Sequence, residues 1–153
     1  MKVKIYRICK DNPLPTQANS GDAGWDVYAA EDVSFSPGEI ELVPLGIIAQ
    51  APKGYHFKLC IRSSIAKKRG LIQPNAPGII DHLYSGKKDE IKLMLQAPMK
   101  FGKWGYFDPE TIIKKGERVG QLILEKNNDI EWDEQDDPNF AGKSRGGFGS
   151  TGV

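Results

Sequence analysis

Glycine and proline interrupt this chain so often that only short regular elements fit between them. The 153 residues include 17 glycines and 10 prolines. Between these breaks the apolar residues often alternate with polar ones, most clearly over residues 55–61 and 91–95, as in strands buried on one face. Residues 45–48 and 122–124 are more continuously apolar, which predicts strands covered on both faces. We therefore expect a chain built mainly from short strands.

One short helix is predicted, over residues 63–69, because Gly70 directly after it is a standard helix stop. The sequences at 36–38 and 52–54 combine proline with glycine and predict turns between strands. Many short strands with one small helix predict an all-β fold, either a barrel or a jelly roll.

Charge and cysteine content exclude several classes of protein. The formal net charge is +1, so no overall electrostatic attraction to nucleic acid or to a membrane surface is expected. The N-terminus lacks the apolar core of a signal peptide, and no stretch approaches membrane-spanning length. Cys9 and Cys60 have no second cysteine or paired histidine nearby, which predicts reduced cysteines rather than zinc ligands. We expect an intracellular, cytoplasmic protein with no nucleic-acid and no membrane partner.

The last part of the chain differs from the rest, so we predict a β-barrel core over residues 1–126 followed by a linker and arm over 127–153. Residues 127–140 contain six acidic residues and no basic one, and residues 142–153 are rich in glycine. Ordering such a glycine-rich segment costs about 1–2 kcal/mol per residue in backbone entropy. The prediction is an arm that becomes ordered when it meets a ligand.

Several residue types in this arm suit a nucleotide. Glycine lets successive backbone N–H groups form an anion-binding concavity. Hydroxyl and cationic side chains add phosphate donors, and the single large aromatic side chain can stack on a base. The candidate residues are Lys143, Arg145, Gly147, Phe148, Gly149, Ser150 and Thr151. The alternative is a disordered tail without a ligand.

Arg62, Ser63 and Ser64 stand between the strand predicted over 55–61 and the helix predicted over 63–69. A helix N-terminus offers free N–H groups and a positive dipole end, both of which favour phosphate. The alternative is simple N-capping of the helix by Ser63 or Ser64.

The segment after the helix combines a turn with candidate catalytic groups. Pro77-Gly78 predicts the turn of a hairpin, and Asp81 follows two isoleucines, so its carboxylate is expected at the edge of an apolar pocket, where it could activate water. The Asn75 amide both donates and accepts, which matches the edge of a pyrimidine. The alternative makes Asp81 a turn residue and Tyr84 a surface strand residue.

Two further blocks, residues 23–26 and 116–123, would each pass alone as a turn followed by a strand. Taken together, these five blocks resemble, in order and spacing, the five motifs of the trimeric dUTPase family. The resemblance covers about residues 21–153. Residues 146–152 carry its most specific motif, followed by the pattern over residues 78–86.

The resemblance implies a distorted jelly-roll or β-clip barrel with one short helix, assembled as a three-fold homotrimer whose active sites are shared between subunits. It implies hydrolysis of dUTP to dUMP and pyrophosphate, which keeps uracil out of DNA and supplies dUMP for thymidylate synthesis. The implied cofactor is Mg²⁺, held by substrate phosphates and water with no direct protein ligand.

The resemblance also implies roles for single residues. Asp81 would be the general base for the attacking water, and Tyr84 would pack against deoxyribose and reject ribonucleotides. The hairpin with Asn75 would read uracil, through backbone groups of Gly78, Ile79 and Ile80.

The remaining implied roles concern the phosphates. Arg62, Ser63 and Ser64 would bind the triphosphate, and Gln121 would position phosphate and water. In the arm, Phe148 would close over uracil, while Ser150, Thr151 and a basic residue hold the outer phosphates. Asp26 would be a structural residue or contact a metal-bound water.

The chain departs from the family pattern at several positions. Ser64 replaces the usual glycine, and Leu83 replaces a common acidic residue. Lys143 stands where the family has arginine, with Arg145 two positions later; we favour Arg145 as the phosphate ligand because guanidinium binds phosphate in a bidentate way. Residues 97–111 form a longer, aromatic-rich connection with no assigned role.

Two other functions compete with this interpretation. A dCTP deaminase shares the fold and the Arg-Ser-Ser sequence, and it would need a glutamate base, for which Glu90 is the nearest candidate. Tyr84 and the complete arm argue against deamination. A regulatory jelly-roll protein without turnover would have no need of Asp81, Gln121 or Phe148.

Overall fold

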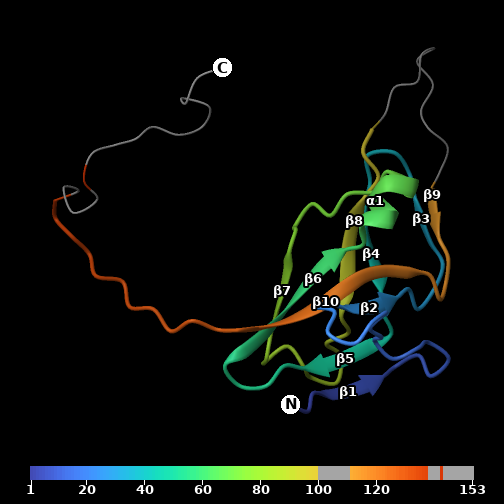
Figure 1. Ribbon diagram of the computed structural model, residues 1–153. Helices are drawn as coiled ribbons and strands as arrows, with labels where there is room; N and C mark the ends of the chain where they lie inside the picture. The colour runs from blue at the N-terminus through green and yellow to red at the C-terminus, as the bar shows by residue number, and fades with distance from the viewer. Residues whose placement is uncertain (100–110, 138–141, 143–153) are drawn as a thin grey trace.

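The computed structural model describes residues 1–99, 111–137 and 142, and within them one body of short strands carries a single helix (Figure 1). The strands and the helix are β1 (Lys4–Arg7), β2 (Trp25–Tyr28), β3 (Val33–Phe35), β4 (Ile40–Pro44), β5 (Ile47–Gln50), β6 (Tyr55–Ile61), α1 (Ser63–Arg69), β7 (Gly78–Asp81), β8 (Lys92–Gln96), β9 (Thr111–Ile113) and β10 (Arg118–Lys126).

The strands pair in six antiparallel ladders, which form four sheets. The largest sheet has the order β2-β10-β6-β7, and the other three are the pairs β1-β5, β3-β9 and β4-β8. Most neighbours in these ladders are far apart in the sequence, as expected for a jelly roll rather than for a series of hairpins. The all-β, jelly-roll prediction is confirmed.

One hydrophobic core joins all four sheets. Strand β6 shows how it is filled: Phe57 and Leu59 are buried, and the residues on either side of each are only half-buried, as the period-2 pattern predicts. Side chains with at most 1% of their surface exposed come from nearly every part of the barrel: Val27, Phe35, Val43, Leu45, Leu71, Ile91, Leu93, Leu95, Ile113 and Val119.

The predicted helix is confirmed at both ends. Helix α1 spans Ser63–Arg69, and Gly70 follows in the left-handed conformation with its N–H bonded to the Ala66 carbonyl. The last turn consists of three basic residues, which complement the negative end of the helix dipole.

Strand boundaries were predicted less well. Strand 55–61 is confirmed as β6, and the predicted turns at 36–38 and 52–54 are present. The segment 45–48 is buried throughout, but its strand begins only at Ile47, because Gly46 turns the chain with a φ of 65°. An added Cβ at Gly46 would lie 2.8 Å from Cβ of Cys9, so the turn also needs the missing side chain.

Two smaller corrections concern β8 and β10. The strand predicted over 91–95 is β8, one residue later. Residues 122–124 lie within β10, but only Leu122 is buried, while Ile123 and Leu124 are half-buried in the single chain. The prediction that both faces of this segment are covered is therefore wrong for one chain alone.

Beyond Lys126, where β10 ends, residues 127–137 are exposed and lead away from the barrel (Figure 1). Among the described residues, no helix is long and apolar enough to cross a membrane. Most of the aromatic connection at 97–111 and nearly all of the arm lie outside the described residues.

Candidate functional site

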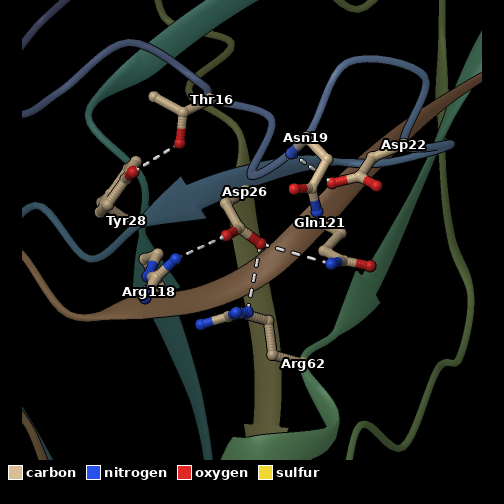
Figure 2. Close-up of polar contacts among 8 residues, drawn as sticks. All are labelled: Thr16, Asn19, Asp22, Asp26, Tyr28, Arg62, Arg118 and Gln121. Atoms are coloured by element: carbon tan, nitrogen blue, oxygen red, sulfur yellow. Dashed lines mark hydrogen bonds and ion pairs between the residues drawn. The ribbon is translucent and has the colours of Figure 1, made fainter.

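Three segments that are distant in the sequence meet at the carboxylate of Asp26, which is only 4% exposed (Figure 2). Oδ1 lies 3.1 Å from Nε of Arg62 and accepts a hydrogen bond of 3.3 Å from Nε2 of Gln121. Oδ2 lies 3.2 Å from Nη1 of Arg118. The structure thus brings together three sequence-predicted residues, Asp26, Arg62 and Gln121, and adds Arg118, which the sequence analysis did not assign.

Strand pairing produces this cluster. In the large sheet Gln121 of β10 lies opposite Asp26 of β2, and Gly120 lies opposite Ile61, the residue before Arg62. On its other side Asp26 exchanges two backbone hydrogen bonds with Thr16, of 2.6 and 3.1 Å. The position of the carboxylate is therefore fixed by backbone on both sides.

The guanidinium groups at this cluster remain accessible to a ligand. The side chain of Arg62 is 24% exposed and that of Arg118 is 49% exposed. Both line a cavity of about 470 Å³ whose other walls are Ser64, Ile65, Lys68, Arg69 and Glu117. Four cationic side chains line this cavity, against two carboxylates: Arg62 and Arg118 pair with Asp26, and Arg69 pairs with Glu117 at 2.7 Å. This charge balance suits an anion such as a phosphate group.

The capping interpretation of Ser63 and Ser64 is wrong. The N-cap of α1 is Arg62, in an extended conformation, and no side chain caps the helix. The hydroxyls of Ser63 and Ser64 are thus not used as helix caps, and Ser64 lines the cationic cavity.

A second cavity, of about 310 Å³, contains the other predicted groups. Its sequence-predicted lining residues are Asn75, Gly78, Ile79, Ile80, Asp81 and Tyr84. The rest of its wall comes from β4, β6, β8 and the segments beside them: Leu42, Leu59, Gln73, Ile91, Lys92 and Met94. An amide, a carboxylate and an aromatic ring therefore face one partly apolar cavity, as the sequence analysis expected of this segment.

The local structure of this segment differs from the predicted hairpin. The turn occupies residues 74–77, and Gly78 is the first residue of β7 rather than a turn residue. Strand β7 pairs with β6. The prediction failed because β7 pairs with β6, which precedes the helix in the sequence, and the local Pro77-Gly78 pattern carries no information about that pairing.

Asp81 and Tyr84 are held together at the end of β7. The N–H of Tyr84 donates to the Asp81 carbonyl at 3.1 Å, and the Tyr84 hydroxyl donates to the Glu90 carbonyl at 3.1 Å. Asp81 is exposed at the cavity edge, where it ends β7 and is the first residue of the turn 81–84, as the turn alternative stated. The other part of that alternative is wrong, because Tyr84 does not belong to a strand. The Glu90 carboxylate instead accepts a 2.9 Å hydrogen bond from the N–H of Gly46.

A row of charged residues crosses the sheet beside Asp81. In register, Glu125 lies opposite His56, and His56 lies opposite Asp81. The hydrogen bond from Lys58, with the charges of Lys58 and His56, lowers the pKa of Glu125. Because the folded-state pKa is depressed, the stabilisation from this carboxylate is present at neutral pH and is lost as the pH falls through that pKa.

The sequence analysis assigned no role to several residues of the candidate site, and Arg118 and Gln73 are the clearest cases. Arg118 stands three residues before Gln121 in the block 116–123. Gln73 is a polar residue inside the otherwise apolar run 71–74, and that interruption was the available signal. The predicted arm residues Lys143, Arg145, Gly147, Phe148, Gly149, Ser150 and Thr151 lie outside the described residues.

A family model described as dUTPase matches residues 10–152. This chain belongs to the dUTPase family. It is 38% identical over 154 residues to the deoxyuridine 5'-triphosphate nucleotidohydrolase of Thermobifida fusca, covering 99% of this chain and 79% of that relative.

Solved dUTPase structures share the fold. The Staphylococcus bacteriophage 80alpha dUTPase, solved with dUpNHpp, superposes with a TM-score of 0.81 at 22% identity over 99% of both chains. The dUTPase of phage phi11 of S. aureus, described with a structural Mg(II) ion, gives a TM-score of 0.73 at 21% identity, over 90% of this chain and 98% of that one.

Asp26→Asn tests the buried cluster. The change keeps the size of the side chain but removes the charge that pairs with two guanidinium groups, so the free energy of unfolding is expected to fall by about 1.5–3 kcal/mol. Urea unfolding at one fixed protein concentration measures it. Asp32→Asn is the matched control, because Asp32 also accepts a 2.8 Å hydrogen bond from a cation, Lys114, but on the exposed surface. Equal effects of the two substitutions would contradict the importance of the cluster.

Proposed function

We propose that this chain hydrolyses dUTP to dUMP and pyrophosphate, which lowers the dUTP available for incorporation into DNA and supplies dUMP for thymidylate synthesis. The observation that carries the proposal is the second cavity, where Asn75, Asp81 and Tyr84 line one space beside β7, an outer strand of the large sheet. These groups match, in order, a pyrimidine base, a water to be activated and a sugar.

Uracil would enter the end of this cavity formed by Asn75 and β7. The Asn75 amide and the backbone groups of Ile79 and Ile80 would bond to the edge of the base. The exocyclic amine of cytosine would place a donor against a donor, and the 5-methyl group of thymine would clash with the strand. Tyr84, fixed by its hydroxyl bond to Glu90, would pack against deoxyribose and leave no room for a 2′-hydroxyl.

Asp81 would be the general base. It would accept a proton from a water molecule as the water oxygen bonds to the α-phosphorus. The bond from that phosphorus to the bridging oxygen breaks, and pyrophosphate leaves. Such a reaction needs little covalent chemistry from the protein, mainly in-line positioning and neutralisation of charge.

The Asp26 cluster would supply the phosphate-binding groups. Arg62 with Ser63 and Ser64 would bind the triphosphate, and Gln121 would position phosphate and water. Within the described residues, no three His, Cys, Asp or Glu side chains gather in a way that could hold a metal. The cationic and hydroxyl groups of this site suit phosphate oxygens rather than a metal ion. The site therefore fits a Mg²⁺ ion whose ligands come from the substrate phosphates and water. Bound with the triphosphate, Mg²⁺ would offset phosphate charge.

The carboxylates of the Asp26 cluster and of the second cavity lie on the two outer strands of one sheet, which supports assembly of several subunits. Asp26 is on β2 and Asp81 is on β7, the outer strands of the order β2-β10-β6-β7. The two strands are three strand spacings apart, about 14 Å. Asp26 is level with Cys60 of β6 and Asp81 with His56, so the two residues are also offset by about 13 Å along the strands. In a homotrimer the Asp26 cluster of one subunit would face the second cavity, here called the nucleoside cavity, of its neighbour. The arm of a subunit would close the site. Phe148 would lie over uracil, and Ser150, Thr151 and either Arg145 or Lys143 would bind the outer phosphates.

Exposed apolar surface agrees with such contacts. Val3, Ile5, Leu14 and Trp25 are each 38–46% exposed and line an apolar hollow of about 360 Å³. Contiguous apolar surface of this kind is typical of protein–protein contacts.

A pyrophosphate-release assay with dUTP, dCTP, dTTP and UTP tests the function. Rapid release is expected from dUTP alone, because each of the other substrates carries one group that the cavity is proposed to reject: the amine of cytosine, the 5-methyl of thymine or the 2′-hydroxyl of UTP. Ammonia release from dCTP without pyrophosphate release from dUTP would instead identify a deaminase.

Asp81→Asn tests the general base. The amide keeps the shape of the side chain but does not accept the proton, so kcat for dUTP is expected to fall by about 10²–10⁴ while nucleotide binding remains measurable by calorimetry. Asp89→Asn is the control, because the Asp89 side chain accepts a 2.7 Å hydrogen bond from the N–H of Gly86, which an amide oxygen can also accept. Unchanged turnover in Asp81→Asn would refute the assignment.

Mixing two inactive variants tests whether sites are shared. Asp81→Asn chains lack the base, and chains without residues 142–153 lack the arm. If base and arm come from different subunits, trimers reassembled from an equimolar mixture are expected to regain about a quarter of wild-type activity. No recovery after confirmed subunit exchange would show that each chain closes its own site.

A further inference from the structure

Gln73 makes two hydrogen bonds to the backbone of β6 through its side-chain amide. Its Nε2 donates to the Leu59 carbonyl at 2.9 Å, and its Oε1 accepts from the N–H of Ile61 at 2.8 Å. Only 9% of the residue is exposed. Few polar side chains are this deeply buried among the described residues, where Asn12 and Asp26 are the others.

These two bonds continue the hydrogen bonding of β6 past its last pair with β7. The register of β6 with β7 ends at Leu59↔Gly78, because the chain turns at residues 74–77 and no strand residue stands opposite Ile61 on that side. The N–H of Arg62 donates to β10, so by alternation Leu59 and Ile61 direct their backbone groups to the opposite side, where β7 lies. A primary amide carries the donor and the acceptor of a peptide group, and Gln73 supplies both.

The same side chain forms part of the nucleoside cavity. Gln73 lines it together with Asn75 and Gly78. An added Cβ at Gly78 would lie 3.6 Å from Nε2 of Gln73 and 3.7 Å from Nδ2 of Asn75, so the two amides and the start of β7 meet at one point. The bonds of Gln73 to β6 thereby hold the turn that carries Asn75 against the cavity wall.

We propose that Gln73 is a positioning residue for base selection: it fixes the distance between Asn75 and β7, and so sets the width of the slot that admits uracil. This inference rests on the proposed function, since it concerns the base-binding end of the same cavity. Gln73 acts through Asn75 and Gly78.

Gln73→Leu tests the proposal, because leucine has a similar volume and makes neither hydrogen bond. The KM for dUTP is expected to rise about tenfold, and the preference for dUTP over dCTP in kcat/KM to fall about tenfold, with kcat changed less than threefold. The control is Gln96→Leu: Gln96 also donates from its amide to a backbone carbonyl, that of Gly38 at 3.1 Å, away from the cavity. That variant is expected to keep both the KM and the preference of the wild type.

Gln73→Glu adds a readout that a merely structural role would not move. A carboxylate still accepts from Ile61 but has no proton to donate to the Leu59 carbonyl, whereas the protonated acid does. Burial beside a carbonyl favours the neutral form and raises the pKa of this glutamate. The KM of Gln73→Glu relative to wild type is therefore expected to approach one as the pH is lowered from 8 to 6, while the ratio for Gln73→Leu stays constant.

The outcomes separate the possible failures. A wild-type chain that releases no pyrophosphate from dUTP would refute the proposed function itself. An active wild type, with Gln73→Leu lowering only the thermal midpoint and leaving KM and the preference for dUTP unchanged, would overturn the role of Gln73 alone. A pH-independent defect in Gln73→Glu would likewise overturn it.

Discussion

The antiparallel pairing of β10 with β6 is the constraint on which the functional surface depends. The ladder runs over seven pairs, from Gly120↔Ile61 to Lys126↔Tyr55. On its other edge β10 places Gln121 opposite Asp26, and β6 in turn places His56 opposite Asp81. A slip of one residue would turn every side chain of the strand to the opposite face. One register therefore positions both the charged cluster at Asp26 and the cavity lined by Asp81.

The Asp26 cluster shows why such precision is needed. Burying a carboxylate costs several kcal/mol, which is offset only when charged partners meet it in good geometry. The two guanidinium groups and the Gln121 amide provide that geometry. These groups are held in place without a ligand, so the proposed binding of a triphosphate would require little reorganisation. Preorganised charge of this kind is usually the largest single contribution to the rate enhancement of an enzyme.

The positions of Asp26 and Asp81, on the two outer strands of one sheet, support the proposed assembly. In the proposed homotrimer, the Asp26 cluster of one chain would meet the second cavity of another chain at every site. Gln73 contributes at the other end of β7. Where the chain turns before β7, the Gln73 side-chain amide bonds the backbone of β6 and lines the second cavity beside Asn75 and Gly78.

The sequence by itself determined the features that depend on local signals. Helix 63–69 and strand 55–61 were predicted because Gly70 and a period-2 pattern specify them directly, and the grouping of Asn75, Asp81 and Tyr84 followed from their short spacing. The tertiary structure alone decided what depends on pairing between distant segments. Gly78 begins a strand instead of closing a hairpin, because its partner is β6. Arg118 joins Asp26 across 92 residues, and Gln73 finds its partners in backbone atoms. Backbone donors and acceptors are the same at every non-proline position of a sequence, so only the folded register selects which of them meet.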